Sequence, residues 1–161
     1  QDLGAWEISR VITLEYMFIS AVSFTGDVST WQTGSVTNMG YIFSRASSFN
    51  GDVSLWQLSS VTDMRWMFNG AISFNGDVSH WDVSNAVDMR AVFASASSFD
   101  RNISAWNTTS ATTMGAMFQG ATSFNSDVSN FDTSSVTDMQ SMFKGASSFN
   151  QDTSSWISKD F

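Results

Sequence analysis

Apolar side chains return to the same positions every 25 residues along the chain, without an insertion or a deletion. One aromatic column consists of Trp6, Trp31, Trp56, Trp81, Trp106, Phe131 and Trp156. Two Phe columns share this period, namely Phe18, Phe43, Phe68, Phe93, Phe118, Phe143 and Phe24, Phe49, Phe74, Phe99, Phe124, Phe149. A further column contains Ala21, Ala46, Ala71, Ala96, Ala121 and Ala146. A strict period of this length predicts stacked coils that bury their apolar side chains against one another.

The repeat that runs from Trp56 to His80 predicts one short helix. Its apolar residues recur at i, i+3, i+4 and i+7, in Met64, Met67, Phe68 and Ala71. This spacing places them on one face of a helix. Thr62 or Asp63 is a suitable N-cap, and Gly70 supplies a left-handed residue that ends the helix.

The same repeat predicts a short strand, because Asp77–Val83 is rich in β-branched and aromatic residues. Its copies in successive coils would pair in parallel. The expected fold class is therefore a right-handed α/β repeat solenoid, leucine-rich-repeat-like, with one short parallel strand and one short helix per 25-residue coil. Residues 1–161 would form a single domain of six repeats from Trp6 with a partial repeat at each end.

The composition argues against several classes of function. The formal net charge is -8, and basic clusters are absent, which disfavours nucleic acids and anionic membranes as partners. The chain has one His and no Cys, and it contains no phosphate-binding loop. No run of eighteen apolar residues is present, so we expect no direct membrane insertion. We therefore expect no enzymatic activity and no cofactor.

The location of the protein is suggested by the start of the sequence. The chain begins with Gln1 instead of Met, which suggests a removed leader or a piece of a longer protein. Both interpretations fit secretion. We therefore expect an extracellular or cell-surface protein.

Three short motifs carry a family resemblance. Thr-Asp-Met-x-x-Met-Phe-x-Gly-Ala occurs at 62–71 and 137–146, Ser-Phe-Asn at 73–75 and 148–150, and Asp-Val-Ser-x-Trp at 77–81. Together they resemble the BspA-like leucine-rich-repeat surface protein family, whose repeats form a domain of unknown function. The resemblance implies a secreted or membrane-anchored surface protein, with adhesion attached to some members. It carries over no catalytic residue.

An acidic column is the most regular polar feature of the chain. Its members are Asp2, Asp27, Asp52, Asp77, Asn102, Asp127 and Asp152. Stacked carboxylates could collect Ca²⁺, but they would also repel one another. The alternative is that each side chain accepts hydrogen bonds from turn amides. We prefer this interpretation and expect no metal site, because Asn102 keeps the acceptor and abandons the charge.

Hydroxyl side chains suggest two further alternatives. A Ser column, Ser29, Ser54, Ser79, Ser104, Ser129 and Ser154, raises the hypothesis of ice binding. Thr residues argue against it, because they are scattered along the repeats instead of forming outward pairs. A solvated or glycosylated face is the preferred interpretation. Asn102 and Asn107 begin N-glycosylation sequons, which matter only in a eukaryotic secreted protein.

Three aromatic residues form a candidate binding surface. Tyr16, Tyr41 and Trp66 share one outward phase of the first three coils. Stacked exposed aromatics suit a sugar or a protein partner. The alternative is that these rings lie on the surface without a partner.

The two ends of the stack are candidate assembly surfaces, because neither shows a polar cap. The end residues in question are Asp2, Leu3, Trp6, Trp156 and Phe161. The chain would be either a segment of a longer array or a protomer that stacks head to tail into a homopolymer.

The functional hypothesis is a non-enzymatic extracellular or cell-surface repeat scaffold for adhesion or structural assembly, with a head-to-tail filament as one form of assembly. The alternative is a carbohydrate- or protein-binding module, and ice binding ranks below both. The expected partners are a surface glycan, a surface protein or a second copy of this chain.

Overall fold

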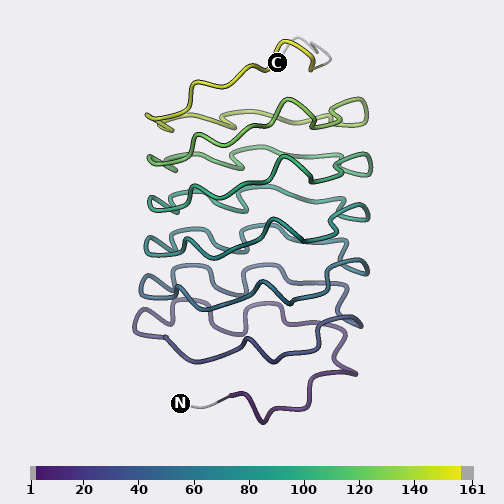
Figure 1. Cartoon of the computed structure of the whole chain (residues 1–161), viewed down its shortest axis with the longest axis vertical. Coiled ribbons are helices and arrows are strands. Elements are labelled where there is room, and N and C mark those ends of the chain that lie inside the picture. The colour runs from purple at the N-terminus through teal and green to yellow at the C-terminus, as the bar shows by residue number, and fades with distance from the viewer. Residues whose placement is uncertain (1–2, 157–161) are drawn as a thin grey trace.

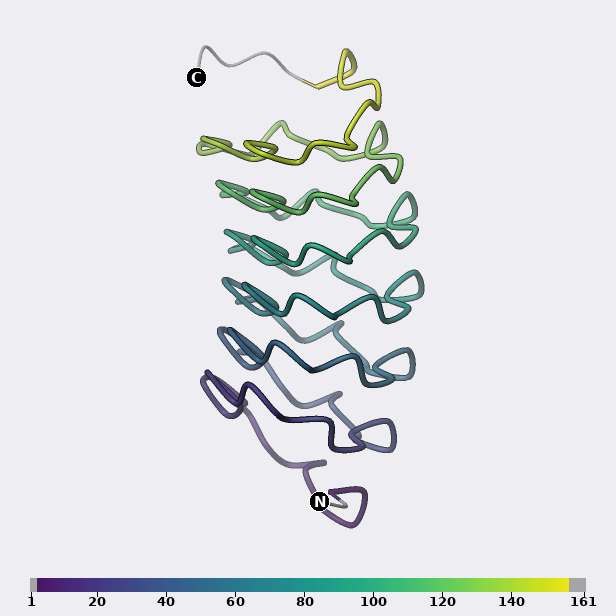
Figure 2. The same ribbon diagram turned by 90° about the vertical axis from the view of Figure 1, so that its left-hand side faces the viewer.

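The chain winds into a stack of coils that rises from the N-terminal to the C-terminal end (Figure 1). The structure is a computed structural model, and it describes residues 3–156. Successive repeats lie directly above one another, so that residues 25 positions apart are neighbours in space. In the perpendicular view the coils keep the same outline along the stack (Figure 2). The predicted columns therefore run along the axis of the stack.

The α/β solenoid prediction is wrong. Residues 3–156 contain no helix, and their β pairing consists of isolated parallel bridges without extended strands. The bridges join one residue of each coil to its copy in the next, namely Thr13 to Asn38, Asn38 to Asp63, Asp63 to Asp88, Asp88 to Thr113 and Thr113 to Asp138. Turns and loops make up the rest of each coil.

The segment 64–71 is not a helix because its amides point alternately in two directions. The N–H groups of Met67, Asn69 and Ala71 donate to carbonyl oxygens three residues back, at 3.0–3.2 Å. The amides between them donate to the next coil, from Met64 to Asp88, Trp66 to Arg90, Phe68 to Val92 and Gly70 to Ala94, at 2.7–2.9 Å. A helix would keep all these bonds inside the segment. The apolar residues of this segment are buried as their period predicts, but a series of turns, and not a helix, places them on the buried face.

Left-handed backbone at two positions per coil produces this alternation. Gly70 has a φ of 68°, as predicted, and Gly120 and Gly145 repeat it. Ser20, Arg45 and Ser95 adopt the same conformation at this phase without being glycine. The second left-handed phase contains Tyr16, Tyr41, Trp66, Ala91, Ala116 and Ser141, with φ between 50° and 63°. Each such non-glycine residue costs about 1–2 kcal/mol, which the bonds to the next coil must offset.

The predicted strand at 77–83 is also wrong. The amide of Trp81 donates to the carbonyl of Val78 at 3.2 Å, and that of Ala86 donates to Val83 at 2.9 Å. These two turns break the segment before it can pair along its length. Parallel pairing occurs instead at Asp63 and its copies, where the sequence predicted a helix cap.

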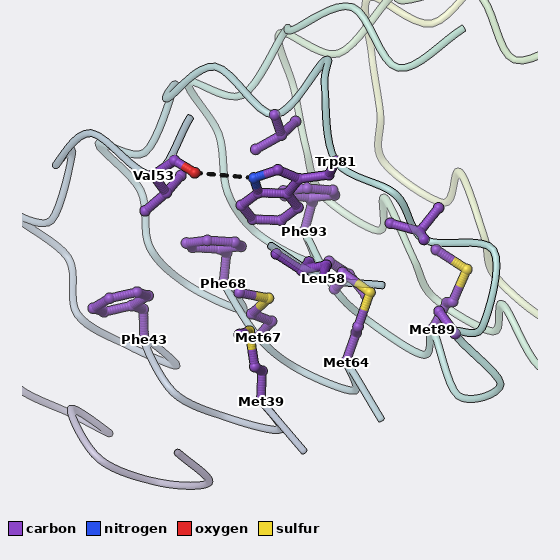
Figure 3. Close-up of a cluster of buried hydrophobic side chains, with 14 of the residues drawn as sticks. Met39, Phe43, Val53, Leu58, Met64, Met67, Phe68, Trp81, Met89 and Phe93 are labelled. Atoms are coloured by element: carbon purple, nitrogen blue, oxygen red, sulfur yellow. Dashed lines mark hydrogen bonds between the residues drawn. The ribbon is translucent and has the colours of Figure 1, made fainter. Parts of the chain in front are cut away.

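The core consists of the predicted columns. Rings of the first Phe column follow one another at centroid distances of 5.5–5.8 Å. Within a coil, the Phe of the second column stacks on the first at 3.7–4.1 Å. Figure 3 shows Phe43, Phe68 and Phe93 in a row beside the Met side chains. Ala46, Ala71, Ala96 and Ala121 are fully buried. Burial of these side chains is the main stabilising contribution.

The Trp column adds a ladder of buried hydrogen bonds. From Trp31 onward, each indole Nε1–H of the column donates to a carbonyl oxygen 28 residues earlier, in the previous coil, at 3.0–3.1 Å: Trp31 to Leu3, Trp56 to Val28, Trp81 to Val53, Trp106 to Val78 and Trp156 to Val128. The bond from Trp81 is drawn in Figure 3. Phe131 occupies the same phase and has no donor, so the carbonyl of Ile103 lacks the corresponding bond.

Phe131→Trp is therefore expected to stabilise the protein. The new indole would donate to Ile103, for a net gain of about 0.5–1.5 kcal/mol per hydrogen bond. Trp106→Phe, the matched reverse change, should cost a similar amount. Urea denaturation followed by circular dichroism measures both. A destabilised Phe131→Trp variant would show that the sixth coil has no space for the larger ring.

Candidate functional site

The aromatic strip, which consists of Tyr16, Tyr41 and Trp66, is brought together as the sequence predicted. The Tyr16 and Tyr41 rings stack with centroids 4.9 Å apart, and those of Tyr41 and Trp66 lie 6.0 Å apart with an interplanar angle of 2°. Tyr16 is 47% exposed and Trp66 is 36% exposed, while Tyr41 between them is partly buried. The left-handed backbone is common to all three residues. The strip is therefore a row of stacked rings on a hydrogen-bonded backbone.

A charged cluster lies beside the aromatic strip. The Arg65 Nη2 donates to Glu15 Oε1 at 3.0 Å, and its Nε lies 3.5 Å from Asp63 Oδ2. The guanidinium carbon is 5.9 Å from the centre of the Tyr41 ring, within range of a cation–π interaction. The hydrogen bond to Glu15 is the first cause that raises the pKa of Arg65, whereas burial raises the pKa of Asp63. Arg65 thus ties three coils together next to the strip.

Sequence reasoning missed a hollow at the C-terminal side of Trp66. It measures about 300 Å³ and is lined by Trp66 together with Arg90, Gln119, Asp138 and Gln140. These side chains come from four coils, so no sequence motif unites them. The available signal was the loss of aromatic residues after Trp66, at Ala91, Ala116 and Ser141.

Of the predicted end residues, the structure describes Leu3, Trp6 and Trp156. Leu3 is buried, and its carbonyl accepts the Trp31 indole bond. Trp6 is half exposed and lines an open hollow of about 480 Å³ at the N-terminal end of the stack. Trp156 is partly buried at the other end. Asp2 and Phe161 lie outside the described residues.

The two ends carry complementary backbone groups. No described residue accepts a bond from the amides of Met139, Ser141, Phe143 or Gly145. The equivalent amides of earlier coils donate to the next coil. Likewise, within residues 3–156 no donor reaches the carbonyls of Thr13, Glu15, Met17 or Ile19. Stacking in perfect register would pair these two sets. It would also superpose residues 3–6 of one copy on 153–156 of the other, so one of these segments would have to be displaced.

A family model described as a Mycoplasma protein of unknown function, DUF285, matches residues 1–101 and 76–161 of the chain. The chain belongs to this family. The two overlapping matches support a repeat protein and are consistent with a repeat surface-protein family. No curated protein and no solved structure matches the chain.

The acidic column of this DUF285 chain is built into turns. In Asp27, Asp52, Asp77, Asn102, Asp127 and Asp152, Oδ1 accepts the amide N–H of the Ser two residues later, at 2.8–3.0 Å. These are the turn-amide hydrogen bonds that we preferred from the sequence. The backbone bonds are also the first cause that lowers the pKa of Asp27, Asp77, Asp127 and Asp152. Among residues 3–156, no three His, Cys, Asp or Glu side chains form a group suited to a metal.

Threonines are not as scattered as the sequence suggested. Thr37, Thr62, Thr112 and Thr137 form one column with Ile12 and Val87. Each Thr hydroxyl donates to a carbonyl of the previous coil, at 3.0–3.4 Å. These Thr hydroxyl groups therefore donate their protons to the protein backbone and not to solvent. Most members of the Ser column are half-buried.

Both sequon asparagines of this family member are exposed. The side-chain oxygen of Asn102 accepts the Ser104 hydroxyl at 2.8 Å, and that of Asn107 accepts the Thr109 hydroxyl at 2.6 Å. Their placement leaves both side chains at the surface.

None of the described residues forms a helix long and apolar enough to cross a membrane.

The acidic column predicts a loss of stability in acid. A carboxyl group whose pKa is lower in the folded protein stabilises it above the unfolded pKa of about 3.9, and this stabilisation disappears as the pH falls through the folded pKa. Replacing Asp27, Asp77 and Asp127 together by Asn keeps each acceptor, as Asn102 does. The decrease of melting temperature below about pH 4 should then be shallower than in the wild type.

Asp77→Ala serves as the control, because it removes the acceptor and should lower the melting temperature at every pH. Thermal unfolding between about pH 2 and 6 measures all three proteins. An unchanged acid slope in the triple Asn variant would mean that other carboxylates dominate. Asp63, whose pKa is raised, has the opposite effect on the pH dependence of stability. It is present in all three proteins, so it does not affect the comparison.

Proposed function

We propose that this protein is a non-enzymatic repeat scaffold of the extracellular or cell surface, and that it acts in adhesion by binding a partner on the aromatic strip. The observation that carries the proposal is the row of stacked rings at Tyr16, Tyr41 and Trp66, of which Tyr16 and Trp66 are exposed and Tyr41 is partly buried. The BspA-like resemblance of the repeats supports a surface location. The partner is a surface glycan or a surface protein.

Pre-organisation supports binding at the strip. The amides of the strip residues donate to the next coil at 2.8–3.0 Å, so the backbone beneath the rings is already fixed. Ring stacking limits side-chain motion further. A partner therefore loses little affinity to ordering this surface, which is the cost that weakens flexible sites.

Charge supports the choice of partner class. The net charge of -8 repels nucleic acid and anionic lipid, whereas an aromatic surface can hold apolar faces of sugars or side chains. The lone His80 is exposed and lies outside the strip. Together these features favour recognition over chemistry.

Replacing Tyr16, Tyr41 and Trp66 together by Ala is expected to reduce binding to the target surface at least about tenfold. The fold should tolerate the change, because Ala91 and Ala116 occupy the same left-handed phase naturally. A matched control replaces three exposed apolar residues outside the strip, Leu55, Ile72 and Val87, by Ala. Cell-binding assays and glycan arrays measure binding, and thermal unfolding checks the fold. Equal binding by both variants would remove the strip from consideration, and turnover of any substrate would refute the non-enzymatic role.

A second candidate function is head-to-tail assembly, which the complementary backbone groups of the two ends favour. Deleting 151–161 removes residues 153–156, which would overlap with residues 3–6 of the next copy, so it should promote fibres. Their subunit repeat should be about 30 Å, or six coil spacings of about 4.8 Å. Met17→Glu, which puts a charge into the N-terminal hollow, should abolish them. Light scattering and electron microscopy at increasing concentration measure assembly. Monomers at every concentration in the truncated chain would exclude it.

A further inference from the structure

We infer that the hollow beyond Trp66 holds one neutral pyranose ring packed against the free face of the Trp66 indole. The inference rests on the proposed function and names a ligand class for the C-terminal end of the aromatic strip. It is drawn from the end of the aromatic column, the size of the hollow and the polar groups around it.

The hollow exists because side chains change while the backbone does not. At the phase of the strip, φ is 58° at Trp66, 50° at Ala91, 55° at Ala116 and 59° at Ser141. The coils therefore continue with the same course, but the large rings stop after Trp66. The missing rings leave a hollow of about 300 Å³, with Ala91, Ala116 and Ser141 on its lining.

Trp66 offers one ring face to this hollow. Its other face stacks on Tyr41, with centroids 6.0 Å apart and planes almost parallel. Among the described residues, no aromatic ring stacks on the side of Trp66 that faces the hollow. A flat six-membered ring would continue the stack there. A volume of about 300 Å³ is at the small end of ligand sites, which favours a single ring over a longer chain.

Polar side chains surround the hollow and favour a sugar over an aromatic side chain. The amide groups of Gln119 and Gln140 make no side-chain hydrogen bond within residues 3–156. Each amide can donate and accept, as each sugar hydroxyl can. An aromatic side chain would cover these amides without pairing them, and burying an unpaired polar group costs free energy. A pyranose instead has a C–H face for Trp66 and hydroxyls at its edge for the glutamines.

The charges favour a neutral ring. The Arg90 guanidinium is already held by Asp88, with Nη2 to Oδ2 at 2.6 Å and Nε to Oδ1 at 3.1 Å. Asp138 accepts the Gln140 amide N–H at 2.9 Å and adds a second carboxylate to the hollow. An acidic sugar would meet Asp88 and Asp138 with only one cation between them. A neutral sugar can accept from Arg90 and donate to Asp138.

The test uses methyl glycosides of glucose, galactose and mannose as probes, and it follows the Trp66 indole and the Gln119 and Gln140 side-chain amides by nuclear magnetic resonance. We expect saturable shifts with a dissociation constant on the order of 1 mM for at least one glycoside. Ala116→Tyr should fill the hollow and weaken binding at least about tenfold. The left-handed phase already accepts Tyr at Tyr16 and Tyr41.

Ala105→Tyr, at an exposed position outside the hollow, is the matched control and should bind as the wild type does. Gln140→Ala is a second variant that removes an exposed side chain without filling space, and it should also weaken binding. Absence of shifts with all three glycosides, equal binding by Ala116→Tyr and Ala105→Tyr, or tighter binding of a methyl glucuronide would each overturn the inference. If the wild type binds no glycoside but adheres to its target surface through the aromatic strip, the pyranose site is refuted and the proposed function is not.

Discussion

The structure depends on amides that point along the stack. In each of the first five coils, four amides at alternate positions donate to carbonyls of the next coil, as Leu14, Tyr16, Phe18 and Ser20 do to Asn38, Gly40, Ile42 and Ser44. A helix cannot do this, because its amides all point along the helix axis and remain inside the segment. The alternation requires two left-handed residues per coil, at about 1–2 kcal/mol for each one that is not glycine. The four hydrogen bonds to the next coil, at about 1 kcal/mol net each, stabilise the coil by an amount similar to this cost. Burial of the side chains therefore determines whether the coil is stable.

Burial is effective here because translation from coil to coil brings identical side chains together. Phe stacks on Phe and Ala lies over Ala, so a side chain that packs well against its copy in one coil makes the same contact in the next. The Trp column repeats a polar contact in the same way, since each indole from Trp31 onward donates to the carbonyl 28 residues before it. Where Phe131 interrupts the column, the smaller ring stays buried and stacks on Trp156, but the indole hydrogen bond is lost.

The sequence predicted which side chains face inward but not the backbone that places them there. Met64, Met67, Phe68 and Ala71 are buried as expected, because their spacing fits one face of either a helix or a series of turns. Nothing in that spacing separates the two, and Trp66 or Arg45 in a left-handed conformation is against intrinsic preference. The strip at Tyr16, Tyr41 and Trp66 could be predicted from phase alone. The hollow beside it could not, because its lining comes from side chains in four coils.

Recognition in such a protein must lie in departures from the repeat. A column that is constant contributes the same packing in every coil and distinguishes no place along the stack. The strip phase differs, because its backbone accepts Tyr, Trp, Ala and Ser at nearly the same φ. Side chains at this phase can therefore change without altering the hydrogen bonds between coils. The step from Trp66 to Ala91 makes one place on the surface unlike the others, and it does so at the point where stacked rings meet unpaired polar side chains.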